Sequence, residues 1–478
     1  MINIDEDDKL REECGVFGVF GAPDASALVA LGLHALQHRG QEACGIVSVD
    51  QDGFHSKRAL GLVDQTFNNR ETLSKLSGDA AIGHNRYATT GATILRNVQP
   101  LYAELAFGGL ALAHNGNLTN AMALRDQLVE DGAIFQSTSD TEVIIHLMAT
   151  QRQQRVIDRL TYALQHILGG YALVVLAEDK MIGVRDPHGI RPLQLGKIGG
   201  AYVLASESCA FDIIGAEFVR DVEPGEMVVI NRDGVQSLRP FPENYPSNSC
   251  IFEYIYFARP DSVINGRSVY MCRKAIGAEL AREAPCEEAD VVVPVPDSGT
   301  PSAIGYSQES GLTFDLGIIR NHYVGRTFIE PGQKIRNLGV KLKHSANRAV
   351  IEGKHVVLVD DSIVRGTTSH KIVEMVRAAG AKSVHMRISS PPTKYPYFYG
   401  IDTPDKNELL ASHMSVEEIA RHIGADSLAY ISIDGLYRAM GIEEGRNNEE
   451  PQFCDSYFTG HYPVALVDHL NKEKKKVA

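Results

Sequence analysis

A cysteine between an acidic leader and an apolar stretch is the first group in the chain that could do chemistry. It is Cys14, in "REECGVFGVF" (residues 11–20), and the thirteen residues before it carry six acids against Lys9 and Arg11. That leader has no basic start, apolar core or small-residue cleavage box, so it is not a secretory signal. A buried cysteine is most often an ordinary small apolar residue. If the leader is removed, however, the thiol of Cys14 gains its own α-amine as a base, as in an N-terminal nucleophile.

Three further stretches of the first half offer the groups that an amide-hydrolysing cysteine needs. "HNGN" provides Asn115 and the Gly116 N–H as donors to an oxyanion. Arg86, in "GHNRYATTG", can pair with an α-carboxylate, and Asp140, in "STSDTE", can hold an α-ammonium group. Each signal alone is weak, because HNG is an ordinary turn and an arginine at a strand end is usually solvated. Only their joint presence after Cys14 indicates a catalytic site.

Taken in this order, these groups resemble the class II glutamine amidotransferases, and "QHRGQEACGI" (residues 37–46) is similar to a characteristic turn of that family. The resemblance implies an Ntn-hydrolase αββα sandwich over residues 14–246. It implies Cys14 as the nucleophile, with the roles just given for the other residues. It also implies that residues 1–13 form a propeptide that is cut before Cys14.

The most specific motif lies in the second half, in "VVLVDDSIVRGTTSH" (residues 356–370). An apolar strand runs into the adjacent acids Asp360 and Asp361, which can accept from ribose hydroxyls or hold Mg²⁺ through oxygen ligands. The following loop and helix start offer backbone N–H groups and hydroxyls to a phosphate. Paired acids after a strand are usually turn residues, but the complete order of strand, acids, loop and helix favours a phosphate-sugar site. The loop residues expected to hold the phosphate are Arg365, Gly366, Thr367, Thr368 and Ser369.

This motif resembles the phosphoribosyl-pyrophosphate (PRPP) motif of the type I phosphoribosyltransferases. That family implies a domain with a parallel sheet, here residues 247–448, and an earlier strand and loop that contact pyrophosphate. "VPVPDSGTPSA" fits that place, with Asp297 and Ser298 at its turn. The resemblance implies Mg²⁺ as a cofactor, with Ser298, Asp360 and Asp361 as its ligands.

A basic segment separates the two motifs, over residues 317–348. It holds seven Lys or Arg residues, among them Arg326 and Lys341, and one acid, against a net charge of −13 for the whole chain. Such a local patch can attract an anionic substrate. Its "EPGQ" turn indicates a mobile loop that closes over pyrophosphate, with Arg326 and Lys341 in contact with PRPP. A solvated basic surface loop is the alternative.

The composition of the whole chain limits the classes of protein to which it can belong. A chain of 478 residues with 44% hydrophobic and 22% charged residues is typical of a globular protein with two or three domains. No apolar run approaches the ~20 residues of a membrane helix, so no membrane association is expected. The net charge argues against nucleic acid as a partner. Seven scattered cysteines, never as CxxC, indicate a reducing cytoplasm.

The elements that must position these groups follow two different patterns. Up to about residue 240 the sequence predicts short strands with glycine turns and interrupting helices, one of them N-capped by Asp24. A proline-bearing joint at residues 239–250 marks a domain boundary. After it, strands and helices alternate, with a capping box "SVEE" at one helix start, which predicts a parallel sheet with ligands at the carboxyl ends of its strands. Residues 449–478 are expected to be a C-terminal tail.

Both halves together, in this order, resemble the PRPP-aminating glutamine amidotransferases of purine synthesis. The resemblance implies an α/β and α+β protein of two domains and the first committed step of the de novo pathway. Glutamine is hydrolysed at Cys14, and the ammonia moves to C1 of PRPP, giving 5-phosphoribosylamine, glutamate and pyrophosphate, a pentosyltransferase reaction. It also implies purine nucleotides as feedback inhibitors and a homo-oligomer. Two alternatives stay open: another glutamine amidotransferase, which leaves the PRPP motif unexplained, and a non-catalytic PRPP or purine sensor.

One branch of that family carries an iron–sulfur cluster on four cysteines. The corresponding positions here are Cys250, Tyr397, Cys454 and Tyr457. Tyrosine cannot replace a thiolate on a conventional cluster, so the sequence predicts a protein without an iron–sulfur cluster.

Overall fold

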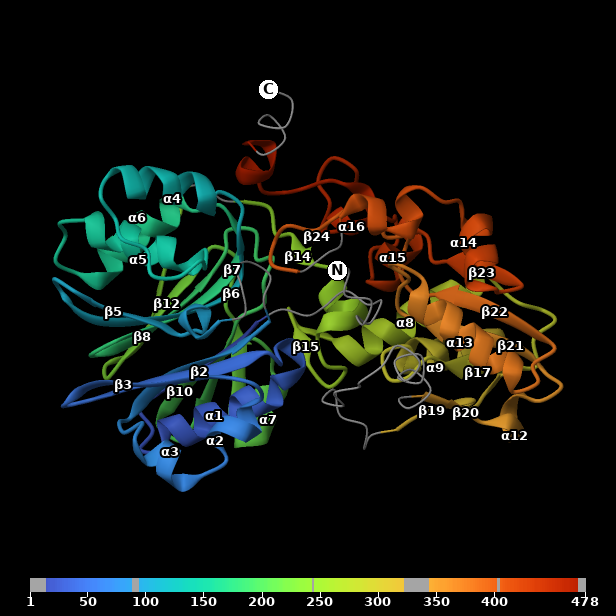
Figure 1. The fold of residues 1–478 in the computed structure, drawn as a ribbon, viewed down its shortest axis with the longest axis horizontal. Helices are drawn as coiled ribbons and strands as arrows, with labels where there is room; N and C mark the ends of the chain where they lie inside the picture. Colours follow the sequence, from blue (N-terminus) through green and yellow to red (C-terminus); the bar gives the residue numbers. More distant parts are fainter. Residues whose placement is uncertain (1–13, 88–93, 243–244, 322–343, 402–404, 472–478) are drawn as a thin grey trace.

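The computed structural model describes residues 14–87, 94–242, 245–321, 344–401 and 405–471. They form two halves that lie side by side, coloured blue to green and yellow to red in Figure 1. Among the described helices, none has the length and apolarity to span a bilayer. The expected propeptide, residues 1–13, and the loop residues Arg326 and Lys341 lie outside the described part of the chain.

The first half contains two antiparallel sheets. The seven-stranded sheet has the order β11-β9-β10-β1-β4-β2-β3, and the six-stranded sheet the order β13-β12-β8-β7-β6-β5. The strands of the first are β1 Gly15–Phe20, β2 Ala43–Asp50, β3 Gly53–Leu60, β4 Ala80–Arg86, β9 Gln194–Ile198, β10 Ala201–Ala205 and β11 Glu217–Asp221. Those of the second are β5 Leu101–Leu105, β6 Gly108–Leu118, β7 Gly169–Ala177, β8 Lys180–Arg185, β12 Met227–Asn231 and β13 Gly234–Leu238.

The two sheets pack face to face, and helices cover both outer faces (Figure 1). One apolar core joins the sheets and includes Val16 and Val174, while two further cores join each sheet to its helices. Helices α4 Ala121–Glu130, α5 Thr141–Thr150 and α6 Val156–His166 cover one face. On the other lie α1 Ala25–Ala35, α2 Val63–Phe67, α3 Arg70–Ser74 and α7 Cys209–Ile214. The predicted αββα sandwich is therefore confirmed.

Strand β1 shows why the sequence after Cys14 is apolar at nearly every position. Side chains alternate between the faces of a strand. Phe17 and Val19 belong to the core under the helices, whereas Val16 and Phe20 belong to the core between the sheets. A strand buried on both faces reads as a continuous apolar run.

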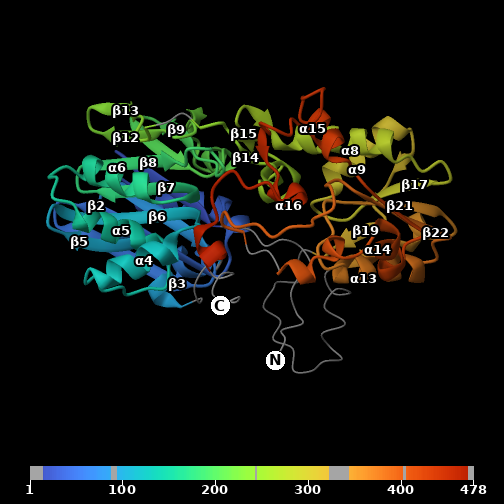
Figure 2. The ribbon, with the colours of Figure 1, turned by 90° about the horizontal axis from the view of Figure 1, so that it is seen from above.

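The second half is built on a five-stranded parallel sheet, as predicted, with the order β18-β17-β21-β22-β23. The strands are β17 Val291–Pro294, β18 Thr313–Phe314, β21 His355–Asp360, β22 Ser383–Ile388 and β23 Ser427–Tyr430. Figure 2 shows helices on both faces of this sheet. One face carries α8 Val269–Glu283, α9 Thr300–Ser310 and α15 Ile433–Ala439, and the other α13 Thr367–Ala378 and α14 Val416–Ile423.

Short elements complete this half and the connections between the sheets. They are β14 Ser249–Cys250, β15 Val263–Ile264, β16 Arg267–Ser268, β19 Ile318–Arg320, β20 His344–Ala346, β24 Phe453–Cys454, α12 Arg348–Ile351, α16 Ser456–Thr459, and the single turns η1 Gln37–Arg39, η2 Leu95–Asn97, η3 Glu253–Phe257, η4 Lys406–Glu408 and η5 Leu410–Ser412.

Two helix starts test the predicted caps. At α14, Ser415 and Glu418 form the predicted capping box. At α1, Asp24 occupies the N-cap position, but its side chain accepts no hydrogen bond from the helix. The predicted cap at Asp24 is therefore correct in position and wrong in its contact.

The described part of the expected C-terminal tail, residues 449–471, is packed against the rest of the protein. Strand β24 pairs with β14, and the aromatic side chains of Tyr457 and Phe458 are buried in the core of the second half. The chain then returns to the first half, where Thr119 Oγ1 donates to the Ala465 carbonyl over 2.7 Å. Asp468 accepts from the first backbone N–H groups of α4, at 2.8 and 3.0 Å. We call residues 462–470 the return segment; the Thr119 hydrogen bond and this helix cap hold it in place.

Candidate active sites

Cys14 lies directly before β1, at the edge of the sandwich. It is 7% exposed, and its Sγ lies 3.6 Å from the carbonyl oxygen of Tyr87. Strands β1 and β4 pair with Gly15 opposite Asn85, so the register brings Cys14 next to Arg86. The sheet therefore places the expected nucleophile beside the expected carboxylate-binding residue.

Two buried histidines join strand β4 to strand β6 and to the start of α5. His84 Nε2 lies 3.1 Å from the carbonyl oxygen of His114, whose Nδ1 lies 3.1 Å from Thr141 Oγ1 and 3.8 Å from Asp140 Oδ2. Burial lowers the pKa of His114, and burial followed by the nearby Arg86 charge lowers the pKa of His84 to about 3. Both rings are therefore neutral at physiological pH and act as hydrogen-bonding links between the elements that carry the site.

Asn115 is fully buried, and its side-chain nitrogen and oxygen both lack a hydrogen-bond partner among the described residues. Leaving a buried polar group unsatisfied costs roughly 1–3 kcal/mol, and such exceptions in native proteins need an explanation. An amide donor held ready for a substrate oxygen supplies one. The adjacent Gly116 has a φ of +136°, and a Cβ built there would lie 2.1 Å from the carbonyl oxygen of Gly170. Only glycine fits this position.

Asn97, which the sequence analysis missed, joins the two residues expected to hold the ends of glutamine. Its carbonyl accepts from Arg86 Nη1 over 2.6 Å, and its side chain exchanges hydrogen bonds with Thr138, two residues before Asp140. Asp140 accepts from the backbone N–H of Leu118 over 3.0 Å. Nothing in the local sequence around Asn97 distinguishes it from an ordinary loop residue, because its role depends on contacts about 40 residues away in the chain.

The second candidate site lies at the carboxyl ends of β17 and β21, where the parallel sheet was expected to bind its ligand. Asp360 and Asp361 are each 1% exposed. Ser298 Oγ donates to Asp361 Oδ1 over 2.5 Å, so the loop after β17 meets the acids that follow β21. Asp297 forms an ion pair with Arg320, at the end of β19. Residues 297–298 and 360–361 are thus brought together as predicted.

The expected phosphate loop leads directly into α13. Gly366 adopts a left-handed conformation with φ of +77° at the N-cap, and Thr367, Thr368 and Ser369 form the first helical turn. The N–H groups of such a turn have no partner within the helix and suit an anion. Arg365 pairs with Glu408 at 2.8 Å.

The donor set of the second site fits a hard divalent cation. Asp360, Asp361 and Ser298 offer only oxygen atoms, which are the ligands that Mg²⁺ prefers. The Ser298 hydroxyl already lies against one carboxylate of the pair, and Ser362 Oγ donates to the other oxygen of Asp361 over 2.8 Å. The Asp361 carboxylate is therefore held in place by two hydroxyl groups, and Asp360 Oδ1 accepts from the Asp361 backbone N–H over 2.9 Å.

The four positions that correspond to a cluster site in one branch of the family lie together between the halves. Cys250 and Cys454 are paired across β14 and β24. The rings of Tyr397 and Tyr457 stack with centroids 4.0 Å apart, and Cys250 Sγ lies 3.7 Å from Tyr457 Oη. Burial raises the pKa of the Cys454 thiol to about 12. Two cysteines and two stacked phenols supply at most two thiolates and do not fit a cluster held by four.

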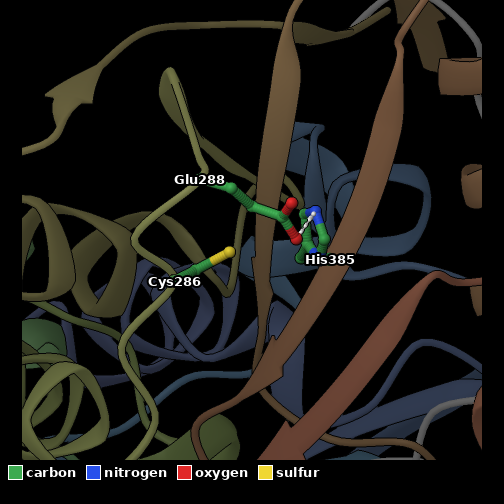
Figure 3. A group of neighbouring side chains, drawn as sticks. All are labelled: Cys286, Glu288 and His385. Carbon is green, nitrogen blue, oxygen red and sulfur yellow. Dashed lines mark ion pairs between the residues drawn. The ribbon is translucent and has the colours of Figure 1, made fainter.

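A separate group of Cys286, Glu288 and His385 lies at the opposite, amino edge of the parallel sheet (Figure 3). His385 Nε2 lies 3.3 Å from Glu288 Oε1 and 2.7 Å from Ser383 Oγ. The guanidinium of Arg387 is close enough to Cys286 to oppose the burial that raises the pKa of this thiol. In these contacts, His385 links Glu288 to Ser383 and Ser427 at the sheet edge.

Comparison with known proteins supports this division of the chain. Family models described as "Glutamine amidotransferase domain" and "Phosphoribosyl transferase domain" match residues 84–212 and 273–389. The chain is 59% identical over 466 residues to an amidophosphoribosyltransferase of Rhizobium etli, covering 96% of this chain and 94% of that one. It is 50% identical over 458 residues to an amidophosphoribosyltransferase of Bacillus subtilis, covering 96% and 95%.

Solved structures agree with the sequence comparison. The glutamine PRPP amidotransferase of B. subtilis, solved in complex with ADP and GMP, superposes with a TM-score of 0.89 at 48% identity, covering 96% of this chain and 100% of that one. A structure described as the allosteric regulatory enzyme of purine biosynthesis gives the same TM-score at 49% identity, covering 95% and 97%.

Proposed function

The chain belongs to the amidophosphoribosyltransferase family, the glutamine-dependent PRPP amidotransferases of purine biosynthesis, and we propose that its reaction runs through the two sites described above. Its substrates are glutamine and PRPP, and the transfer of nitrogen to C1 of a pentose makes it a glycosyltransferase. Neither another class of glutamine amidotransferase nor a non-catalytic sensor is favoured by these relatives. The observation that carries the proposal is that one half holds the buried, unsatisfied Asn115 amide, while the other holds the adjacent buried acids Asp360 and Asp361, the second of which accepts from two serine hydroxyls.

In the first half, Cys14 attacks the carboxamide carbon of glutamine. Arg86 holds the α-carboxylate and Asp140 the α-ammonium group, while Asn115 and the Gly116 N–H stabilise the oxyanion. Ammonia leaves, a thioester remains on Cys14, and water converts it to glutamate. For this role Cys14 is the first residue of the active chain, so residues 1–13 are a removed propeptide, and the glutaminase domain spans residues 14–246.

In the second half, residues 247–448, the loop from Arg365 to Ser369 holds the 5-phosphate of PRPP at the start of α13. Asp297, Arg326 and Lys341 contact the pyrophosphate group, and the two acids after β21 hold the ribose hydroxyls. Asp360, Asp361 and Ser298 would hold Mg²⁺, which when bound stabilises the charge of the leaving pyrophosphate. Ammonia displaces the pyrophosphate at C1. As the bond from C1 to pyrophosphate breaks, the ribose gains oxocarbenium character.

Regulation and assembly belong to the same proposal. The B. subtilis relative was solved with ADP and GMP, which supports purine nucleotides as feedback inhibitors of this enzyme. We propose a homo-oligomer in the cytoplasm, with no nucleic-acid or membrane partner, on the family resemblance and the cysteine usage of the chain.

The proposed function is tested by glutamate release from glutamine with and without PRPP. We expect PRPP and Mg²⁺ to stimulate glutamate release, with 5-phosphoribosylamine formed in equal amount. Hydrolysis that is indifferent to PRPP would favour another glutamine amidotransferase, and no hydrolysis at all would favour a sensor.

We predict that the purified enzyme contains neither iron nor sulfide and is colourless. Tyr397 and Tyr457 fill two of the four positions with stacked phenol rings, which supply no thiolate. Elemental analysis of active, anaerobically purified protein, with its visible spectrum, measures this. Stoichiometric iron and sulfide with a brown absorbance band would contradict the prediction.

A further inference from the structure

A buried glutamate of the second half, Glu253, lies between two arginines of the first half. It accepts from Arg39 Nη1 and Nη2 at 3.3 and 2.5 Å and from Arg191 Nη1 at 3.3 Å. All three side chains are 2% exposed or less, and neither reaction uses them. We propose that Glu253 is a positioning residue that couples the two halves by fixing two walls of the glutamine site. This inference rests on the residue roles proposed above.

The buried network around Glu253 contains two arginines, Arg39 and Arg191, and two glutamates, Glu253 and Glu207. Arg39 also donates to Glu207, which is fully buried and accepts from Ser262 Oγ over 2.6 Å. Burial opposes the charge on the guanidinium, but the attraction of Glu207 and Glu253 outweighs it and raises the pKa of Arg39. Removing one partner of such a buried set leaves an uncompensated charge, which the neighbouring backbone must move to accommodate.

The first wall runs from Arg39 to the nucleophile and the carboxylate-binding residue. A Cβ built on Gly40, the next residue, would lie 2.7 Å from the backbone carbon of Arg86. A Cβ on Gly15, which follows Cys14, would lie 3.5 Å from Arg39 Cβ. Gly40 and the side chain of Arg39 therefore pack directly against the backbone that carries the two site residues.

The second wall runs from Arg191 to the oxyanion hole. Arg191 donates through Nε and Nη2 to the carbonyl oxygen of Tyr399, at 2.9 and 2.8 Å. The next residue, Gly400, has a φ of +101°, and a Cβ built on it would lie 2.6 Å from the carbonyl carbon of Gly116. Asn117 Nδ2 donates to the carbonyl of Phe398 over 2.9 Å. A segment of the second half thus forms the outer support of the strand that holds Asn115 and Gly116.

The Glu253 carboxylate of the second half therefore contacts Arg39, where the first wall begins, and Arg191, where the second begins. A shift of η3, the turn that begins at Glu253, acts on Cys14 and Arg86 through Arg39, and on Gly116 through Arg191 and Tyr399. Displacement of a site by about 1 Å can lower a rate by about 100-fold without any loss of a catalytic group. The geometry supplies a physical route by which a residue of the second half changes glutaminase activity.

The first test is Glu253→Gln, which keeps the shape and removes the charge. We expect the kcat for glutamine hydrolysis to fall by about 10- to 100-fold and the KM for glutamine to rise, because both walls shift. Synthesis from ammonia and PRPP should stay within about twofold of the wild type, because the wall residues belong to the glutamine site. The matched control is Glu279→Gln: Glu279 also bridges two arginines, Arg438 and Arg282, at 2.7 and 2.8 Å and is 8% exposed, but lies within the second half.

The second test addresses one wall alone and decides the outcome if Glu253→Gln fails to fold. In Gly400→Ala the new methyl group presses on Gly116, so kcat for glutamine hydrolysis should fall by about 10-fold or more with KM unchanged, since an oxyanion hole acts in the transition state. Gly311→Ala is its control, because Gly311 has a φ of +74° with nothing within 4 Å of its Cβ position.

Two results would overturn the coupling: an equal loss of glutamine- and ammonia-dependent synthesis in Glu253→Gln, or a Gly400→Ala variant that behaves like Gly311→Ala. Failure of the wild type to make 5-phosphoribosylamine from ammonia and PRPP is a different result. It would refute the proposed function, and the coupling would then be judged from glutaminase kcat and KM alone.

Discussion

Replacing Cys14 with serine abolishes glutamine-dependent synthesis and leaves ammonia-dependent synthesis intact: this is the largest effect we expect. Loss of the nucleophile should lower the glutaminase rate by about 1000-fold or more, since no other described residue at that site offers a thiol to form the thioester. Added ammonia enters the reaction after the step that Cys14 carries out. The measurement is 5-phosphoribosylamine formation from PRPP with glutamine or with ammonium as the nitrogen source.

Two controls accompany the Cys14→Ser variant. Cys272→Ser removes a thiol of similar exposure, 8%, from α8 of the second half and should leave both activities within about twofold of wild type, because a buried Cys without a role acts as a small apolar residue. Intact mass should show that the active wild-type chain begins at Cys14. Loss of both activities in Cys14→Ser, or full activity in a chain that retains residues 1–13, would contradict the assignment.

The second large effect is expected from Asp361→Asn. Asp361 accepts from Ser298 and Ser362 at the meeting point of the two loops, so its charge faces the proposed PRPP and Mg²⁺ site. We expect both glutamine- and ammonia-dependent synthesis to fall by about 100-fold or more, as for loss of one electrostatic contact to a developing charge. Glutamate release without PRPP should be unchanged, because Cys14 and its partners are untouched.

Asp315→Asn is the matched control for this variant, since Asp315 lies in the same half, after β18, and its Oδ1 accepts only from the adjacent Leu316 N–H in the described contacts. Initial rates of synthesis and of glutamate release are measured on each variant. Retained synthesis in Asp361→Asn would refute its role, and an equal fall in PRPP-independent glutamate release would place the residue in the first site.

The proximity of the groups in the second candidate site was predictable from sequence, because most of them are nearly contiguous. Asp360, Asp361 and the loop up to Ser369 follow one strand, and the parallel sheet brings Ser298 to them from the neighbouring strand. Residues that lie this close together along the chain can be recognised in the sequence as a motif.

The contacts that hold the residues of the first candidate site in place were not predictable in the same way. His114 was visible only as part of "HNGN", and Asn97 carried no signal, although both join the substrate-holding residues. The contact between Arg39 and Glu253 spans 214 residues, and nothing in either local pattern distinguishes a buried ion pair from two solvated charges. Charge pairing in the interior depends on the docked halves, which propensity and periodicity do not describe.

The packed end of the chain was missed for a related reason. The chain ends in the lysine-rich "NKEKKKVA", which is typical of a solvated tail, and residues 449–478 were expected to form a tail. Burial of Tyr457 and Phe458 depends on the apolar core of the second half, and the position of Asp468 depends on helix α4 of the first half.

The return segment has a consequence for the order in which the protein is made. Helix α4 receives its N-terminal cap from Asp468, across 346 residues of chain, beside the Leu118 N–H that holds Asp140. A nascent chain leaves the ribosome from its N-terminus, and domains generally fold in that order. Here the cap of α4 cannot form until nearly the whole polypeptide, including the second half, has emerged. The topology therefore makes the completion of the first half depend on residues that are translated after the second half.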